Sequence, residues 1–112
     1  MLHVSITRDA QGLIASFEAR GHTGLAPTGS DVACAGASAL VQAAVLGCQR
    51  HLRIAPGIQQ EEGFLYFTLP MQMEEGANGK AQAILETMLA GLEEISHLYP
   101  GRIEIETLVL PS

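Results

Sequence analysis

Two residues of this chain, Cys34 and His22, could together perform nucleophilic chemistry. The pattern of residues 31–52 predicts a helix, and Cys34 would lie in its first turn. The positive end of the helix dipole and the free backbone N–H groups there stabilise a thiolate, the reactive form of cysteine. His22 lies in a glycine-containing segment just upstream and could fold back over that turn. A base within hydrogen-bonding reach of a thiol is the minimal unit of cysteine catalysis, and the free N–H groups could stabilise an oxyanion.

Each candidate residue also has an ordinary structural explanation. A cysteine on the apolar face of a helix is most often a core residue, and a histidine in a loop is usually a solvated side chain. Asp31 is most simply the N-cap of the helix, although it could orient His22 as the third member of a triad. Ser38, one turn after Cys34, could contact a substrate but more often bonds to a carbonyl of its own helix. Spacing alone therefore supports a Cys–His enzyme only weakly.

The second cysteine gives little reason to expect a disulfide or a metal site. On one helix, Cys34 and Cys48 would be separated by ~21 Å at 1.5 Å per residue, whereas a disulfide needs Cα atoms within ~7 Å. We therefore expect two free thiols and a reducing compartment. Cys48 and His51 have a ligand-like spacing, but no second pair completes a tetrahedral zinc site. We expect no metal and no cofactor.

The segments that would position these residues begin with a β-hairpin. Residues 2–7 alternate between apolar and polar, residues 9–12 have turn chemistry, and residues 13–19 alternate again. In this second strand the core face is predicted to carry Leu13, Ala15, Phe17 and Ala19. Residues 20–30 contain three glycines and no periodicity, which predicts a mobile loop.

The helix that follows would be capped by Ser30 or Asp31 and is rich in alanine and glycine, which lets a neighbouring element approach closely. Strands are predicted around residues 53–59 and 64–69, the first of them irregular because it contains Pro56. Asn78 would cap a second, amphipathic helix that stops at residues 100–101, before a last strand over residues 103–109.

The resulting order, ββαββαβ, predicts an α+β fold in which two helices pack on a mainly antiparallel five-stranded sheet. We see no linker or internal repeat, so residues 1–112 form a single domain in this interpretation.

Charge and hydropathy narrow the possible partners. The chain has twelve acidic and six basic residues, which gives a formal net charge of −6. The basic residues are scattered, so the chain is poorly suited to bind nucleic acid and better suited to meet a basic protein. The N-terminus lacks a signal-peptide pattern, and the apolar stretch 32–46 is interrupted by polar residues and too short to span a bilayer. These features predict a cytoplasmic protein that does not bind membranes.

A motif over residues 21–40 raises the weight of the Cys–His interpretation. The run G-H-T-G … G-S-D-V-A-C-A-G-A-S-A-L resembles the signature of the ribosomal-processing cysteine protease family, also called the YsxB-like family. That signature is Gly-His, a short glycine-containing loop, and then Gly-x-Asp-x-x-Cys-Ala-x-x-Ser. The matching positions are Gly21, His22, Gly29, Asp31, Cys34, Ala35 and Ser38. Chain length and element order agree over the whole chain.

The resemblance implies an endopeptidase that removes a short N-terminal extension from the precursor of a large-subunit ribosomal protein. It implies that Cys34 is the nucleophile, that His22 transfers the proton, and that the protein is a homodimer. Asp31 and Ser38 would support the pair, and Gly21, Gly24 and Gly29 would belong to a loop that covers substrate. Residues 25–28 diverge from the family pattern, which concerns substrate preference more than chemistry. The alternative is a non-catalytic ribosome-assembly or protein-interaction module of the same fold.

Overall fold

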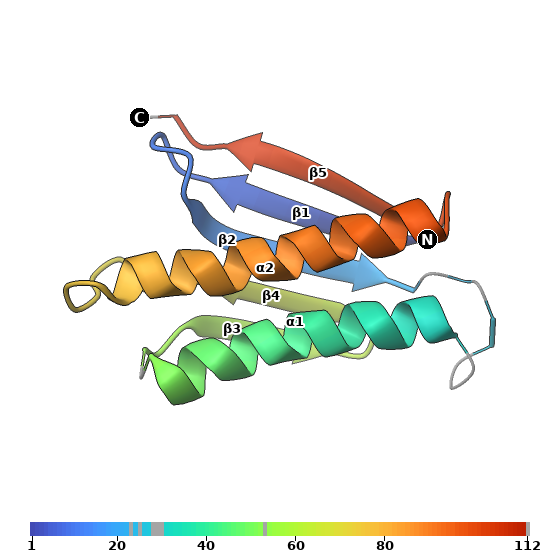
Figure 1. Ribbon diagram of the computed structural model, residues 1–112, viewed down its shortest axis with the longest axis horizontal. Coiled ribbons are helices and arrows are strands. Elements are labelled where there is room, and N and C mark those ends of the chain that lie inside the picture. The colour runs from blue at the N-terminus through green and yellow to red at the C-terminus, as the bar shows by residue number, and fades with distance from the viewer. Residues whose placement is uncertain (23, 25, 28–30, 53, 112) are drawn as a thin grey trace.

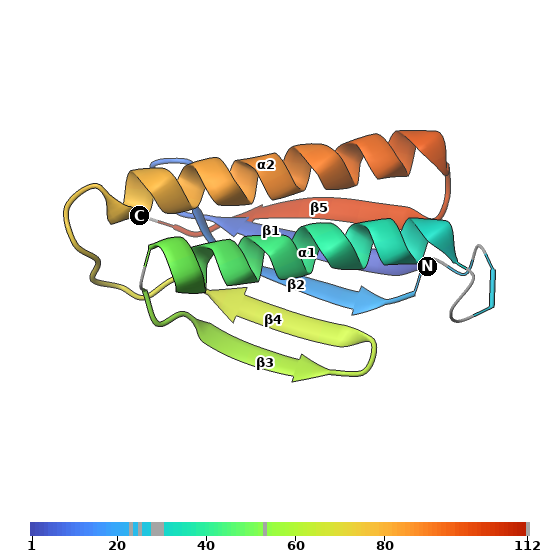
Figure 2. The same cartoon turned by 60° about the horizontal axis from the view of Figure 1, so that its bottom comes forward.

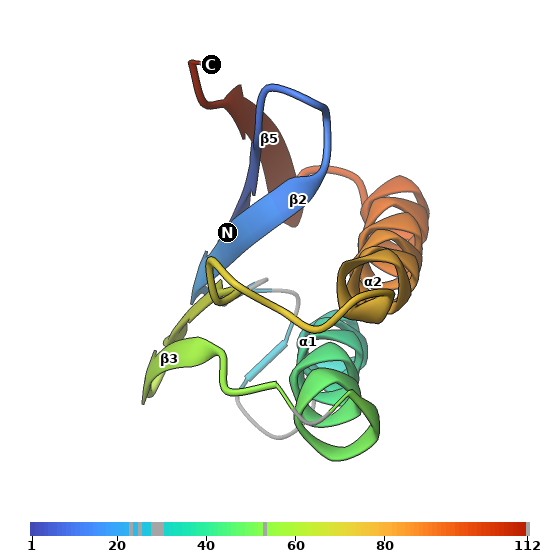
Figure 3. The same ribbon diagram turned by 90° about the vertical axis from the view of Figure 1, so that its left-hand side faces the viewer.

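Five strands and two helices follow one another in the computed structural model, which describes residues 1–22, 24, 26–27, 31–52 and 54–111. The elements are β1 (Leu2–Arg8), β2 (Ile14–Gly21), α1 (Val32–His51), β3 (Gly57–Glu61), β4 (Phe64–Thr68), α2 (Ala77–Leu98) and β5 (Ile103–Val109) (Figure 1). Both helices cover the same face of the sheet, and the other face carries no helix (Figure 3). The predicted element order and fold class are confirmed.

The strands lie in the order β3-β4-β2-β1-β5. Three neighbouring pairs are antiparallel, whereas β1 and β5 are parallel, so the sheet is mixed. The parallel pair arises because α2 carries the chain across the helical face before β5 joins the far edge of the sheet (Figure 1). The central strands β1 and β2 are thus made early in the sequence, and their outer neighbours are added later.

Two predicted strand boundaries were wrong. Residues 20 and 21 belong to β2 and not to a loop, since β1 pairs with both residues and β4 pairs with Arg20. The third strand covers Gly57–Glu61 instead of residues 53–59, because Pro56 cannot donate a ladder hydrogen bond and the strand begins after it.

The second helix starts earlier than predicted. Its N-cap is Gly76, at a φ of +83°, and Asn78 lies inside the first turn. The Asn78 side chain accepts a hydrogen bond from Gln82 Nε2 at 3.2 Å. Asn78 therefore supports the first turn from within and is not the cap.

The inward face of β2 also differs from simple alternation. Leu13 is 38% exposed, whereas Ile14 is 1% exposed, and Phe17 stacks on Phe67 with ring centroids 5.0 Å apart. The register between β1 and β2 shifts between Thr7 and Arg8. A bulge of this kind changes which residues face the core, so the alternation seen at Phe17 does not extend back to Leu13.

The small residues of α1 are used against α2. A Cβ built on Gly36 would lie 3.2 Å from Ile95 Cδ1, and one built on Gly47 would lie 3.5 Å from Ile84 Cδ1. The neighbour that the small-residue helix admits is thus the second helix of the same chain.

Helix α1 is long and apolar enough that its length and hydropathy alone would let it cross a membrane. The prediction that the apolar stretch 32–46 is too short to span a bilayer does not apply to the whole helix, which runs for 20 residues. Its buried stripe, however, packs into the domain core, which is common for the central helix of a globular domain. That stripe consists of Ala33, Ala37, Val41, Ala44, Val45 and Cys48.

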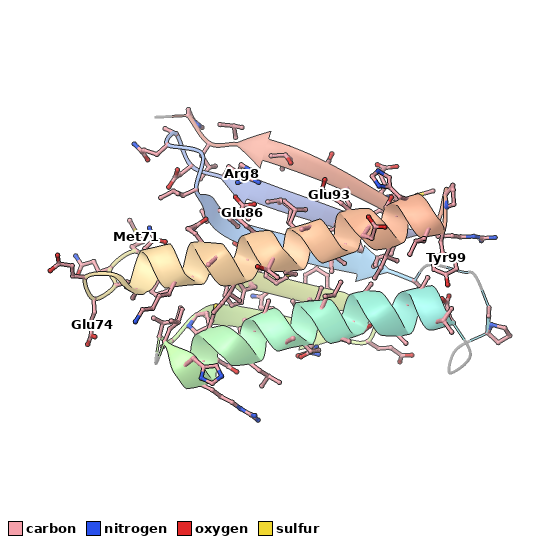
Figure 4. The ribbon with its side chains drawn as sticks, viewed as in Figure 1. Arg8, Met71, Glu74, Glu86, Glu93 and Tyr99 are labelled. Carbon is pink, nitrogen blue, oxygen red and sulfur yellow. The ribbon has the colours of Figure 1, made fainter. Side chains whose placement is uncertain are left out.

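Two polar contacts tie α2 to the first hairpin. Arg8 forms a two-pronged ion pair with Glu86, at 2.7 and 3.0 Å, in the region labelled in Figure 4. Gln82 bonds the main chain of Ile14 twice: its Oε1 accepts from the amide at 2.7 Å, and its Nε2 donates to the carbonyl at 2.8 Å. These contacts fix the crossover helix over the hairpin.

Candidate active site

The end of β2 and the start of α1 lie at the same end of the domain (Figure 2). There His22 Nδ1 is 3.8 Å from Cys34 Sγ, within reach of a hydrogen bond that involves sulfur. Cys34 is partly exposed and His22 is exposed, so both can be reached from solvent. The structure therefore brings together the thiol and the imidazole that the sequence singled out.

Gly21 makes the turn that sends His22 away from the sheet. It is the last residue of β2, pairs with Leu2 and has a φ of +93°. A Cβ at this position would lie 2.6 Å from the carbonyl oxygen of Met1, a contact that side chains do not tolerate. Gly21 is therefore needed to end the strand, and it belongs to β2 and not to the predicted loop. Its role toward a substrate stays a prediction.

Asp31 is the N-cap of α1. Its Oδ1 accepts a hydrogen bond from the amide of Cys34 at 2.8 Å, and its Oδ2 accepts one from the amide of Ala26 at 3.4 Å. The carboxylate is buried. These contacts fix the backbone of Cys34 in the third helical position and also tie the preceding segment to the helix start.

The cap restricts which amides could serve as an oxyanion hole. The N–H of Cys34 donates to Asp31 Oδ1, and the N–H of Ala35 donates to the Asp31 carbonyl at 3.0 Å. Of the first four amides of α1, this leaves at most those of Val32 and Ala33. The expectation that the whole turn offers free N–H groups was therefore too broad.

An open cavity of about 390 Å³ lies beside the thiol. Its volume is in the range of small-molecule and peptide subsites. The apolar part of its lining comes from the sheet and from α1, while His22, Cys34 and Ser38 stand among its polar groups. The charged side chains among its described lining residues, histidine aside, are the acidic Asp31 and Glu61.

The segment after His22 is tethered to the turn that precedes β5, which lies at the same end of the domain (Figure 1). Gly24, at a φ of +69°, accepts a hydrogen bond from Arg102 Nη1 at 3.0 Å. Gly29 and Ser30 lie outside the described residues, so the prediction of a mobile loop over residues 20–30 stays a prediction for that part.

The remaining candidates from the sequence lie apart from this site. Cys48 is fully buried, and burial raises the pKa of its thiol. Both cysteines are free, as predicted. In the part of the chain that the structure describes, no three His, Cys, Asp or Glu side chains are grouped to hold a metal ion.

Sequence reasoning missed two residues that border the pair. Gly63, in the β3–β4 turn, accepts a hydrogen bond from the amide of Gly21 at 2.8 Å, and a Cβ built on it would lie 3.1 Å from His22 Nε2. Arg102 holds Gly24 from the turn before β5. The Glu62-Gly63 turn could have been predicted from its residue types, but its position beside His22 depends on the β4–β2 pairing, which no local pattern reveals.

A thiol and an imidazole facing each other at the mouth of a cavity, at the start of a helix, define a candidate cysteine hydrolase. The sequence model of the family described as cysteine protease Prp matches residues 1–104. The chain belongs to this cysteine protease family.

The similar proteins agree with this assignment. The ribosomal processing cysteine protease Prp of Bacillus subtilis is 32% identical over 112 residues, covering 98% of this chain and all of the relative. A crystal structure of the Staphylococcus aureus protease with a covalently linked product peptide has a TM-score of 0.86 at 28% identity. A second, with a substrate peptide, has a TM-score of 0.81 at the same identity. Each covers 96% of this chain and 99% of its own.

Proposed function

We propose that this chain is an endopeptidase that removes a short N-terminal extension from the precursor of a large-subunit ribosomal protein. The observation that carries the proposal is the 3.8 Å approach of His22 Nδ1 to Cys34 Sγ at the mouth of an open cavity. The names of the relatives supply the substrate class, since they are ribosomal processing proteases.

In the proposed mechanism His22 Nδ1 takes the proton of the Cys34 thiol, and the thiolate attacks the carbonyl carbon of the scissile peptide. The tetrahedral intermediate collapses to a thioester, and the leaving amine takes the proton back from the imidazolium. Water, deprotonated by His22, then hydrolyses the thioester and frees the thiol. Asp31 supports this chemistry by fixing the Cys34 backbone, and Ser38 stands at the cavity wall one turn further along α1.

Charge supports a basic substrate. The chain has a formal net charge of −6, and Glu61 stands at the cavity. A ribosomal protein is basic, so long-range attraction favours its encounter with this surface. The same charge disfavours direct binding of nucleic acid. Because ribosomal precursors are made in the cytoplasm, we place the protein there and assign it no membrane partner.

The proposed homodimer rests on the family resemblance and on apolar side chains left exposed near the end of β5, namely Leu108, Val109 and Leu110. The small residues of α1 no longer support it, since α2 uses them. Sedimentation at working concentration tests the dimer directly: a monomer would disprove it. Within this proposal each site lies in one chain, because His22 and Cys34 of the same chain meet.

The test of the function is incubation of the purified chain with the precursor encoded in the same genome, followed by mass spectrometry. We expect a single cut near the precursor N-terminus. Cys34→Ser and His22→Ala should abolish it, whereas Cys48→Ala should keep it. If the folded protein, whether dimeric or monomeric, binds the precursor but does not cleave it, the result would favour the non-catalytic assembly module.

A further inference from the structure

We infer that Gly63 is a positioning residue for His22: the β3–β4 turn acts as the backstop against which the imidazole is held toward Cys34. The inference rests on the proposed function and adds a residue outside the 21–40 motif. It begins from the position of the ring. One nitrogen of His22, Nδ1, faces the sulfur, so the other, Nε2, must face something else.

That other side is Gly63. A Cβ built on Gly63 would lie 3.1 Å from His22 Nε2, 3.7 Å from Cε1 and 3.8 Å from Cδ2. Three ring atoms thus sit over one hydrogen of the glycine Cα. A side chain there would be closer than ordinary van der Waals contact, so the ring would have to move by a few tenths of an ångström.

The turn is attached to the strand that carries His22. The carbonyl of Gly63 accepts a hydrogen bond from the amide of Gly21, the residue immediately before His22, at 2.8 Å. The same residue therefore fixes the backbone on one side of His22 and limits the ring on the other. In a Cys–His–Asp site a carboxylate orients the imidazole; here a backbone turn occupies the side of the ring away from the thiol.

A simpler explanation of Gly63 is its turn. Its φ is +71°, and the second residue of a two-residue hairpin turn is commonly glycine or asparagine for that reason alone. Asparagine separates the two explanations, because it accepts a positive φ but brings a Cβ against the ring. Gly12 offers a matched control, since its φ is +86° and nothing lies within 4 Å of a Cβ built there.

The experiment compares Gly63→Asn with Gly12→Asn by the rate at which iodoacetamide alkylates Cys34 between pH 5 and pH 9. The small reagent avoids any effect of a bulkier cavity wall on substrate binding. We expect Gly12→Asn to match the parent and Gly63→Asn to react about tenfold more slowly near neutral pH, since small misplacements of a catalytic group are costly. The profile of Gly63→Asn should shift toward that of His22→Ala.

Adding Gly63→Asn to the His22→Ala variant should not lower the alkylation rate of Cys34 any further, because the substitution at Gly63 acts through His22. Additive losses, or a Gly63→Asn rate equal to that of Gly12→Asn, would overturn the inference. If the Gly63→Asn variant melts below the assay temperature, the inference requires that the Gly63→Asn/His22→Ala double variant melts at a higher temperature than Gly63→Asn alone. A double variant that melts no higher would also overturn the inference. If His22→Ala itself leaves alkylation of Cys34 unchanged, the Cys–His pair of the proposed function fails instead.

Discussion

Arg102 Nη1 donates a hydrogen bond to the carbonyl of Gly24 at 3.0 Å, joining two residues 78 positions apart in the chain. The main chain of Arg102 is fixed as well, because its carbonyl accepts from the amide of Leu2 at 3.0 Å. The segment that carries His22 is thus held on both sides. Arg102, next to the edge strand β5, holds it at Gly24, two residues after His22, and Gly63 holds it at Gly21, one residue before His22.

We predict that Arg102→Gln lowers kcat severalfold while the melting temperature stays within about 1 °C, because the lost bond is exposed and local. Faster hydrogen exchange at residues 22–27 would accompany the loss. Arg50→Gln is the control, since it removes one positive charge at the exposed end of α1. Equal kcat values for the two variants would show that the bond does not position the segment.

The two thiols should differ strongly in reactivity. Cys34 is partly exposed beside His22, whereas Cys48 is fully buried and burial raises the pKa of its thiol. We expect iodoacetamide near neutral pH to label Cys34 at least about a hundredfold faster than Cys48, as followed by peptide mapping of the native protein. In denaturant the two rates should converge. Faster native labelling of Cys48 would contradict the site assignment.

The ion pair between Arg8 and Glu86 predicts that the free energy of unfolding depends on pH in the acidic range. Its hydrogen bonds hold the pKa of the Glu86 carboxyl below its usual value. A depressed folded-state pKa adds stability above the unfolded value of about 4.3, and that stability is lost as pH falls through the folded pKa. The Glu86 side chain is 47% exposed, so the contribution is at most about 1 kcal/mol.

Glu86→Gln should therefore lower the free energy of unfolding near pH 7 by no more than about 1 kcal/mol. The difference from the parent should shrink below pH 4. Urea unfolding at a series of pH values measures both. Thr87→Ala, one residue away on the exposed side of α2, is a control for general effects on the helix. A difference that persists unchanged at pH 2 would rule out the ion pair as its source.

Gln82 should matter more for stability than its partly buried position suggests. Its side chain satisfies both the amide and the carbonyl of Ile14, a residue that is 1% exposed. Gln82→Ala leaves two main-chain groups without their partner, which costs about 1–3 kcal/mol. Gln49→Ala, exposed on α1, should cost far less. Denaturant unfolding measures the free energy of unfolding of both variants. Equal losses of this free energy would mean that water replaces the Gln82 side chain.

Much of this architecture could be read from local patterns, and the failures have physical causes. Alternation gave the strands and the three- to four-residue apolar spacing gave the helices, because each element buries one face. The inward turn of Ile14 was missed because the bulge depends on pairing with β1. The start of α2 was missed because a glycine in a left-handed conformation replaced the side-chain cap that Asn78 suggested.

The site shows the same division. Cys34 could be placed because a helix start has a recognisable sequence, and His22 because it lies nearby and within a motif. Gly63 and Arg102 could not be placed, since their contacts with this segment depend on long-range strand pairing. Residues that do the chemistry were thus visible locally, and residues that hold them were not.

The parallel pairing of β1 with β5 has a consequence for how the protein is made. Both candidate catalytic residues leave the ribosome early, but β1 acquires its second neighbour only when residues 103–109 have been synthesised. At roughly 5–20 residues per second this interval lasts several seconds. Arg102, the anchor of the segment after His22, directly precedes that strand and is made just before it. We expect the nascent chain to stay proteolytically silent until β5 has been made and has paired with β1, so synthesis of this strand would itself switch the activity on. A released chain ending at Tyr99 that cleaved the precursor would disprove this.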